Sequence, residues 1–222
     1  MPAPLATPLP LPAPAFTAVL FGLSGCLVDF GARSIAMLDH HTLSNAAPDD
    51  IHAAIKDHAI ATLGAVSILK SLSRQGVPVA WLDELPSSIS VCLAAPLDEW
   101  IVPGNRSAGG TGWPAPDACW QALMTLNVKQ LDGCVLISGD PRLLQSGLNA
   151  GLWTIGLASC GPLCGLSADD WQALSNADRE YRRGQATLQL YAQGVHSVID
   201  HLGELPSCLA DISLRRTKGE KP

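Results

Sequence analysis

Side chains that could carry chemistry follow three apolar runs of the chain, each of which predicts a strand. Cys26 and Asp29 come after the first run, Asp83 after the second, and Asp140 after a later one. Ligands of open parallel sheets bind at the carboxyl ends of the strands, so these groups are candidates for one cleft. A thiolate at Cys26 could be a nucleophile, but no base lies beside it in sequence, which favours packing. Asp83 could point into the cleft, although a turn or helix-cap role is favoured.

Alternating strands and helices are predicted to position these groups. The strands are expected at residues 18–21, 77–82, 100–102, 134–138, 153–157 and 195–199. The helices are expected at residues 48–63, 65–74, 85–93, about 116–126 and 143–150, followed by a long helix capped by Ser167 and a last helix from Asp200. Short links between alternating elements predict an α/β fold with a parallel sheet and helices on both faces.

The first strand and its turn carry a recognisable motif. Residues 18–31 read A-V-L-F-G-L-S-G-C-L-V-D-F-G. This resembles the first motif of the haloacid dehalogenase (HAD) superfamily, and more narrowly that of the phosphonoacetaldehyde hydrolases (phosphonatases), D-x-A-G-T-x-V-D-F-G. In that family the leading Asp attacks phosphorus and binds Mg²⁺. Its place here falls on Gly22, which has no side chain to attack with.

Later motifs extend the resemblance to about residues 17–31 and 64–222. Residues 112–116, G-W-P-A-P, resemble the family's G-R-P-x-P. Residues 138–140, S-G-D, and residues 149–156, N-A-G-L-W-T-I-G, resemble its G-D-T-x-x-D and N-A-G-M-W-T-V-G. The resemblance implies a HAD-type Rossmann-like core with degenerate catalytic motifs.

The resemblance also says what the motif positions would have done. The family holds Mg²⁺ between the nucleophilic Asp, a backbone carbonyl two residues later and the Asp of the G-D motif. Here the Ser24 carbonyl and Asp140 remain, so we expect no metal or weakly bound Mg²⁺. Leu144 takes the place of a second acidic residue.

Two further motif positions have changed in character. Asp83, followed by Glu84, stands where the family has a Thr or Ser that holds a phosphoryl oxygen, and carboxylates repel a phosphate dianion. Trp113 stands where phosphonatases have a cationic Arg. It could stack a ligand or plug the cleft.

The phosphonatase cap is predicted to be strongly reduced, to an insertion at about 32–63 within a core of residues 17–222. Only about 45 residues separate Gly31 from Val77, which leaves room for at most two helices. Lys56 lies in a stretch that faintly resembles the family's Schiff-base lysine, but a solvent-facing lysine is favoured.

These observations favour a phosphonatase-like protein that has lost phosphoryl transfer and binds a partner or a small phosphorylated or phosphonate ligand. A weak Mg²⁺-dependent hydrolase of phosphonoacetaldehyde or a phosphoester is one alternative. A homodimer or complex subunit that uses the face vacated by the cap is another. The ligand pocket is predicted to be lined by Gly22, Ser24, Gly25, Cys26, Asp29, Asp83, Trp113 and Asp140.

Composition limits the remaining classes of function. The 222 residues are 47% hydrophobic and 15% charged, with a net charge of -6, which predicts a globular chain that does not bind nucleic acid. No apolar run is long enough for a membrane span, and residues 1–16 are expected to form a flexible Pro/Ala-rich arm. Seven cysteines without a secretory signal predict reduced thiols and a cytoplasmic location.

Overall fold

A six-stranded parallel sheet forms the centre of the computed structural model, which describes residues 16–34, 38, 53–105 and 111–222. Its strand order is β3-β2-β1-β4-β5-β6, so the chain first builds outward from β1 on one side and then on the other. The strands are β1 (Ala18–Gly22), β2 (Val79–Asp83), β3 (Val102–Asn105), β4 (Cys134–Ser138), β5 (Trp153–Leu157) and β6 (Ser197–Ile199). The predicted parallel α/β fold is confirmed.

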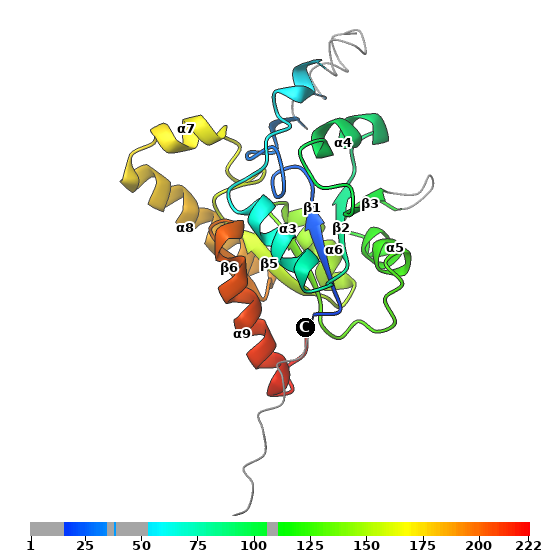
Figure 1. Ribbon diagram of the computed structural model, residues 1–222. Coiled ribbons are helices and arrows are strands. Elements are labelled where there is room, and N and C mark those ends of the chain that lie inside the picture. The colour runs from blue at the N-terminus through cyan, green and yellow to red at the C-terminus, as the bar shows by residue number, and fades with distance from the viewer. Residues whose placement is uncertain (1–15, 35–37, 39–52, 106–110) are drawn as a thin grey trace, which may run out of the picture.

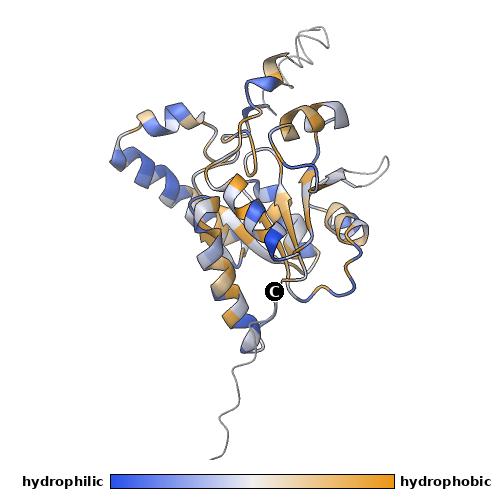
Figure 2. Cartoon of the chain, viewed as in Figure 1, coloured by the Kyte–Doolittle hydropathy of each residue, from blue (hydrophilic) through white to orange (hydrophobic). Residues whose placement is uncertain are grey.

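Helices cover both faces of this sheet (Figure 1). Successive side chains of a strand point to opposite faces, so Val19 and Phe21 belong to one apolar core and Ala18 and Leu20 to another. The first core is closed by α3 (Ala65–Arg74), α4 (Ser87–Ala94) and α9 (Leu205–Thr217). The second is closed by α5 (Asp117–Thr125) and α6 (Pro141–Asn149). Figure 2 shows the strands as largely hydrophobic, as expected for strands buried on both faces.

The long helix predicted from Ser167 is wrong, because the chain forms two helices there. Ser167 does cap α7 (Ala168–Ala173), since its Oγ accepts a hydrogen bond from the Asp170 amide at 3.0 Å. However, Leu174 is extended, and α8 (Asn176–Gln193) begins with a cap of its own at Ser175. The second cap repeats the chemistry of the first, and the two helices project from the core together (Figure 1).

Other predicted boundaries shift. The third strand lies at 102–105 instead of 100–102. The last helix does not start at Asp200; a 3-10 helix, η1 (Leu202–Glu204), capped by His201, precedes α9. In the predicted helix at 48–63, residues 53–56 are helical and residues 59–63 are not, because the chain turns at 57–58.

Two predicted segments lie largely outside the described residues. The arm at 1–16 is described only at residue 16, and the reduced cap at 32–63 only at residues 32–34, 38 and 53–63. Among the described helices, none combines the length and the apolar character that a membrane crossing requires.

Three glycines bring the loops after β1, β4 and β5 into backbone contact. A Cβ added to Gly139 would lie 2.6 Å from the carbonyl oxygens of both Cys160 and Gly25. A Cβ on Gly161, whose φ is +92°, would lie 2.7 Å from the Gly139 backbone, and one on Gly25 would lie 2.7 Å from the Gly161 Cα. These distances are too short for any side chain. The three loops can therefore approach this closely only because each has a glycine at the point of contact.

We predict that Gly139→Ala destabilises the fold by about 2–3 kcal/mol, because the methyl group must push apart rigid backbone rather than a flexible side chain. Chemical unfolding at constant pH measures this change. Gly184→Ala is the matched control. Gly184 lies in α8 with no atom near its added Cβ, so this change is expected to stabilise the chain by about 0.5–1 kcal/mol. Equal effects of the two substitutions would contradict the close-contact explanation.

Candidate functional site

The carboxyl ends of β1, β2 and β4 bring together groups that were predicted from distant parts of the sequence. Gly22 ends β1, Asp83 ends β2, and Asp140 caps α6 directly after β4. They meet because β1 lies between β2 and β4 in the sheet.

Two side chains crowd the position that a Cβ would take on Gly22. A Cβ placed on Gly22 would lie 2.8 Å from Ser138 Oγ and 3.4 Å from Leu143 Cδ2. Ser138 Oγ is held there, because it accepts a hydrogen bond from the Asp140 amide at 2.9 Å. A carboxylate at position 22 would therefore collide with Ser138 unless that side chain moved.

Trp113 is bound through its backbone to residues that follow β2 and β4. It is only 9% exposed and packs in the core formed with α5 and α6. Its backbone amide donates to Glu84 Oε1 at 2.6 Å, and its carbonyl accepts from Arg142 Nη2 at 2.7 Å. Arg142 Nη1 also lies 3.1 Å from Glu84 Oε2. Of the two alternatives for Trp113, this burial favours the plug.

The sequence motifs include Glu84 but indicate neither Arg142 nor the pairing of the two side chains. Arg142 follows the G-D motif by two residues, which places a cation beside the site. Its pairing with Glu84 depends on the proximity of the ends of β2 and β4, and neither local sequence contains a sign of it.

Asp83 is a buried carboxylate with incomplete hydrogen bonding. Its Oδ1 accepts from the Leu85 amide at 3.0 Å, as in a turn. Its Oδ2 is buried and has no hydrogen-bond partner among the described residues. Burial raises the pKa of Asp83 from 3.8 to about 6, and the nearby charges of Asp29 and Glu84 add to the rise.

The donors that remain near the G-D motif do not form a magnesium cage. Asp140 Oδ1 accepts from the Arg142 amide at 2.7 Å, and burial raises the pKa of the Asp140 carboxyl. Ser24 Oγ donates to Asp29 Oδ2 at 2.7 Å. In residues 16–34, 53–105 and 111–222, no three His, Cys, Asp or Glu side chains are grouped to hold a metal ion. Mg²⁺ is commonly held by one or two carboxylates with water in its remaining octahedral positions, and Asp140 is the carboxylate of the G-D motif that would offer such a weak site.

Cys26 and Gly25 are enclosed by the protein. The Cys26 side chain is fully buried, and its Sγ donates weakly to the Ile137 carbonyl at 3.5 Å. Burial raises the pKa of the Cys26 thiol well above its usual range, which disfavours the thiolate a nucleophile requires. Gly25 is covered by Gly161.

Two other candidate positions lie away from these groups. Leu144 is fully buried against Leu190 and Val195 beneath α8. Lys56 is exposed on the short helix at 53–56. Neither is among the residues that line the cavity of about 990 Å³ described next.

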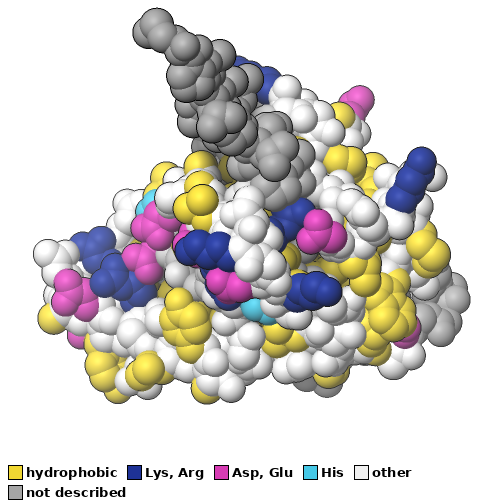
Figure 3. All heavy atoms as spheres, turned by 90° about the horizontal axis from the view of Figure 1, so that it is seen from below, with side chains coloured by type: hydrophobic (Ala, Val, Ile, Leu, Met, Phe, Trp, Pro, Cys, Tyr) yellow, Lys and Arg dark blue, Asp and Glu magenta, His cyan; other side chains and the backbone are white. Residues whose placement is uncertain are grey.

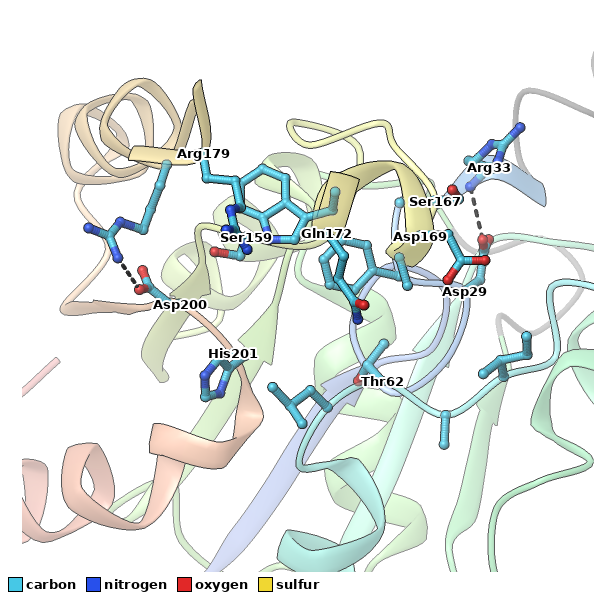
Figure 4. A pocket seen from close by; sticks show the side chains of 18 of the residues that line it. Asp29, Arg33, Thr62, Ser159, Ser167, Asp169, Gln172, Arg179, Asp200 and His201 are labelled. Carbon is cyan, nitrogen blue, oxygen red and sulfur yellow. Dashed lines mark hydrogen bonds and ion pairs between the residues drawn. The ribbon is translucent and has the colours of Figure 1, made fainter. Parts of the chain in front are cut away.

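A cavity of about 990 Å³ lies between α7, the start of α8, Asp200, His201 and residues 57–63 (Figure 4). Of the eight residues predicted to line the ligand pocket, only Asp29 lines this cavity. The other seven are not among its lining residues, and their role as a ligand pocket stays a prediction.

Asp29 is a fixed, buried carboxylate at the edge of the cavity. It accepts hydrogen bonds from the Arg33 amide at 3.1 Å, the Ser34 amide at 3.0 Å and the Ser34 hydroxyl. His58 Nδ1 lies 3.4 Å from Asp29 Oδ1, and the His58 ring also lines the cavity. These contacts orient an imidazole at the cavity wall.

The other walls combine aromatic surface with fixed charges of both signs. The rings of Phe30 and Trp171 lie 6.2 Å apart, centroid to centroid. Arg183 Nη1 pairs with Asp200 Oδ2 at 2.7 Å. A cavity of this size and lining can bind a small molecule with an apolar part and charged groups.

Known proteins with similar sequence are phosphonoacetaldehyde hydrolases. The enzyme of that name from Klebsiella pneumoniae subsp. pneumoniae is 36% identical over 154 residues, which are 69% of this chain and 56% of that protein. The chain thus spans little more than half the length of this curated relative. No protein-family model matches the chain.

Solved structures share the fold over nearly the whole chain. One crystal structure is 64% identical, covers 94% of this chain and all of its own, and has a TM-score of 0.82. The phosphonoacetaldehyde hydrolase-like protein from Oleispira antarctica is 20% identical, with 98% of this chain and all of that one covered and a TM-score of 0.80.

We predict that Asp83 makes stability depend on pH in a defined window. The folded state binds its proton up to about pH 6 and the unfolded state only to about 3.8, so the free energy of unfolding falls as pH rises between these values. Over the whole window the free energy of unfolding of the wild type falls by about 3 kcal/mol because of Asp83. Denaturant unfolding from pH 4 to pH 7 should show that Asp83→Asn gains most of this amount of stability relative to the wild type as pH rises.

The exposed Asp211→Asn substitution is the matched control, and we expect it to keep the wild-type profile. A constant difference between Asp83→Asn and the wild type from pH 4 to pH 7 would contradict the prediction.

Proposed function

Because this chain belongs to the phosphonatase-like branch of the HAD superfamily, we propose that it keeps the scaffold of these hydrolases but binds a ligand or partner without transferring phosphoryl groups. The observation that carries the proposal is the crowded position at Gly22. Ser138 Oγ lies 2.8 Å from the position of a Cβ there, so the nucleophile is missing and a side chain in its place would require the Ser138 hydroxyl to move.

The electrostatics of the strand ends support the same conclusion. A phosphoryl-transfer site stabilises the developing negative charge with cations or preorganised donors. Here Asp83, Glu84 and Asp140 surround the position, and Arg142 is engaged with Glu84 and the Trp113 carbonyl. A phosphate dianion would meet carboxylates in place of free donors.

The cavity beside α7 and α8 is the site where we place a small ligand. Its volume of about 990 Å³ lies at the upper end of the range for small-molecule pockets. Trp171 and Phe30 offer apolar surface, and Arg183 and Asp200 offer charges. The relatives are named for phosphonoacetaldehyde, which makes this compound the first probe.

A complex subunit is a second candidate, favoured by two exposed apolar residues at the edge of the cavity. Ile60 is 68% exposed and Leu63 is 65% exposed. Such side chains together mark surface that a partner could cover. The mass of the chain in solution, with Ile60→Asp as the test variant, distinguishes assembly from ligand binding alone.

We predict that the wild type does not hydrolyse phosphonoacetaldehyde or p-nitrophenyl phosphate with Mg²⁺ above the level of Asp140→Ala. Gly22→Asp alone is expected to stay inert, because Ser138 occupies the space of the new carboxylate. The double variant Gly22→Asp, Ser138→Ala tests whether room is limiting. If the wild type turns over substrate and Asp140→Ala abolishes that activity, the proposed loss of catalysis is wrong. The chain would then be the weak Mg²⁺-dependent hydrolase of the alternative hypothesis.

We predict that phosphonoacetaldehyde binds in the cavity without metal, as measured by titration calorimetry. Trp171→Ala should raise the Kd about tenfold, because a ring that contacts the ligand is lost. Trp100→Ala is the matched control, since Trp100 is 37% exposed and does not line the cavity. Equal losses in both variants would contradict this location of the ligand.

A further inference from the structure

An apolar groove lies along α5 and the turn that follows it. Trp120, Met124 and Leu131 line it and are 44%, 66% and 45% exposed, and its volume is about 400 Å³. Lys129 is the one charged side chain among its lining residues. In the view from below, hydrophobic side chains gather on the side where Figure 1 places α5, while charged side chains are denser on the α8 side (Figure 3).

The N-terminal part of the chain enters the fold beside this groove. The Thr17 amide donates to the Gly133 carbonyl at 2.9 Å, and its Oγ1 donates to the Asp132 carbonyl at 2.5 Å. Asp132 directly follows Leu131 of the groove. The described part of the chain therefore begins next to one end of the apolar surface.

The composition of residues 1–15 matches that surface. The segment reads M-P-A-P-L-A-T-P-L-P-L-P-A-P-A, with six prolines, three leucines and no charged side chain. Proline-rich segments are bound in aromatic-lined grooves at low entropic cost, because proline restricts the free chain. In the extended polyproline II conformation, 15 residues span about 45 Å. This length is sufficient to follow a groove that begins close to residue 17.

We propose that the groove lined by Trp120, Met124 and Leu131 is the docking site of the Pro/Ala-rich segment 1–15 of the same chain. The exposed apolar side chains of α5 would then be covered by a segment that carries no charge to desolvate. This contact lies apart from the cavity of the proposed function and is independent of it.

Photo-crosslinking in the full-length chain tests the contact. The photoreactive residue p-benzoylphenylalanine replaces Leu9, and the products are mapped by peptide mass spectrometry. We expect the main crosslink at Met124 or its neighbours in the groove. Leu131→Asp should lower its yield about tenfold, the ratio that corresponds to about 1.4 kcal/mol of lost apolar burial.

Leu188→Asp is the matched control, because Leu188 is 67% exposed on α8, far from the groove in sequence and in the fold, and it should leave the yield unchanged. A mixture of ¹⁵N-labelled and unlabelled protein separates crosslinks within a chain from crosslinks between chains. Crosslinks spread over the surface, an equal loss in Leu188→Asp, or products of mixed isotope composition would each overturn docking within the same chain.

Discussion

The structure depends on the backbone contact between the loops that follow β1, β4 and β5. Gly25, Gly139 and Gly161 let these loops approach to distances that no side chain permits. The contact holds the loop after β1, which carries Asp29, against the loop after β4, which carries Asp140. The Gly161 amide also donates to the Phe30 carbonyl at 2.7 Å, which ties the cavity wall to the same point.

A scaffold held in this way can persist while the reacting groups change. The loops that would present a nucleophile and a metal ligand are held by main-chain atoms, whereas the reacting groups are side chains. Ser138 now lies against Gly22, and Glu84 and Arg142 pair with each other and bind the backbone of Trp113. Burial of Asp83 with no hydrogen-bond partner for Oδ2 among the described residues is a cost of this arrangement.

Sequence patterns predicted the sheet and most of its helices, because apolar periodicity and caps are local properties. The Ser167 cap was found in this way. The break between α7 and α8 was missed, since residues 168–193 favour helix nearly throughout and a second cap at Ser175 decides the break. For the site, the motif predicted that Gly22, Asp83 and Asp140 belong together, but not that Ser138 would crowd position 22.

The sequence by itself determined the family, the parallel α/β core and the absence of a carboxylate at position 22, because each is written in residue types at fixed spacing. Only the tertiary structure decided what lies against the vacated position and where a cavity lies. Those outcomes depend on contacts between residues far apart in the chain, such as Ser138 with Gly22 or Arg142 with Glu84. Their distances are set by how strands and helices pack, which no local pattern encodes.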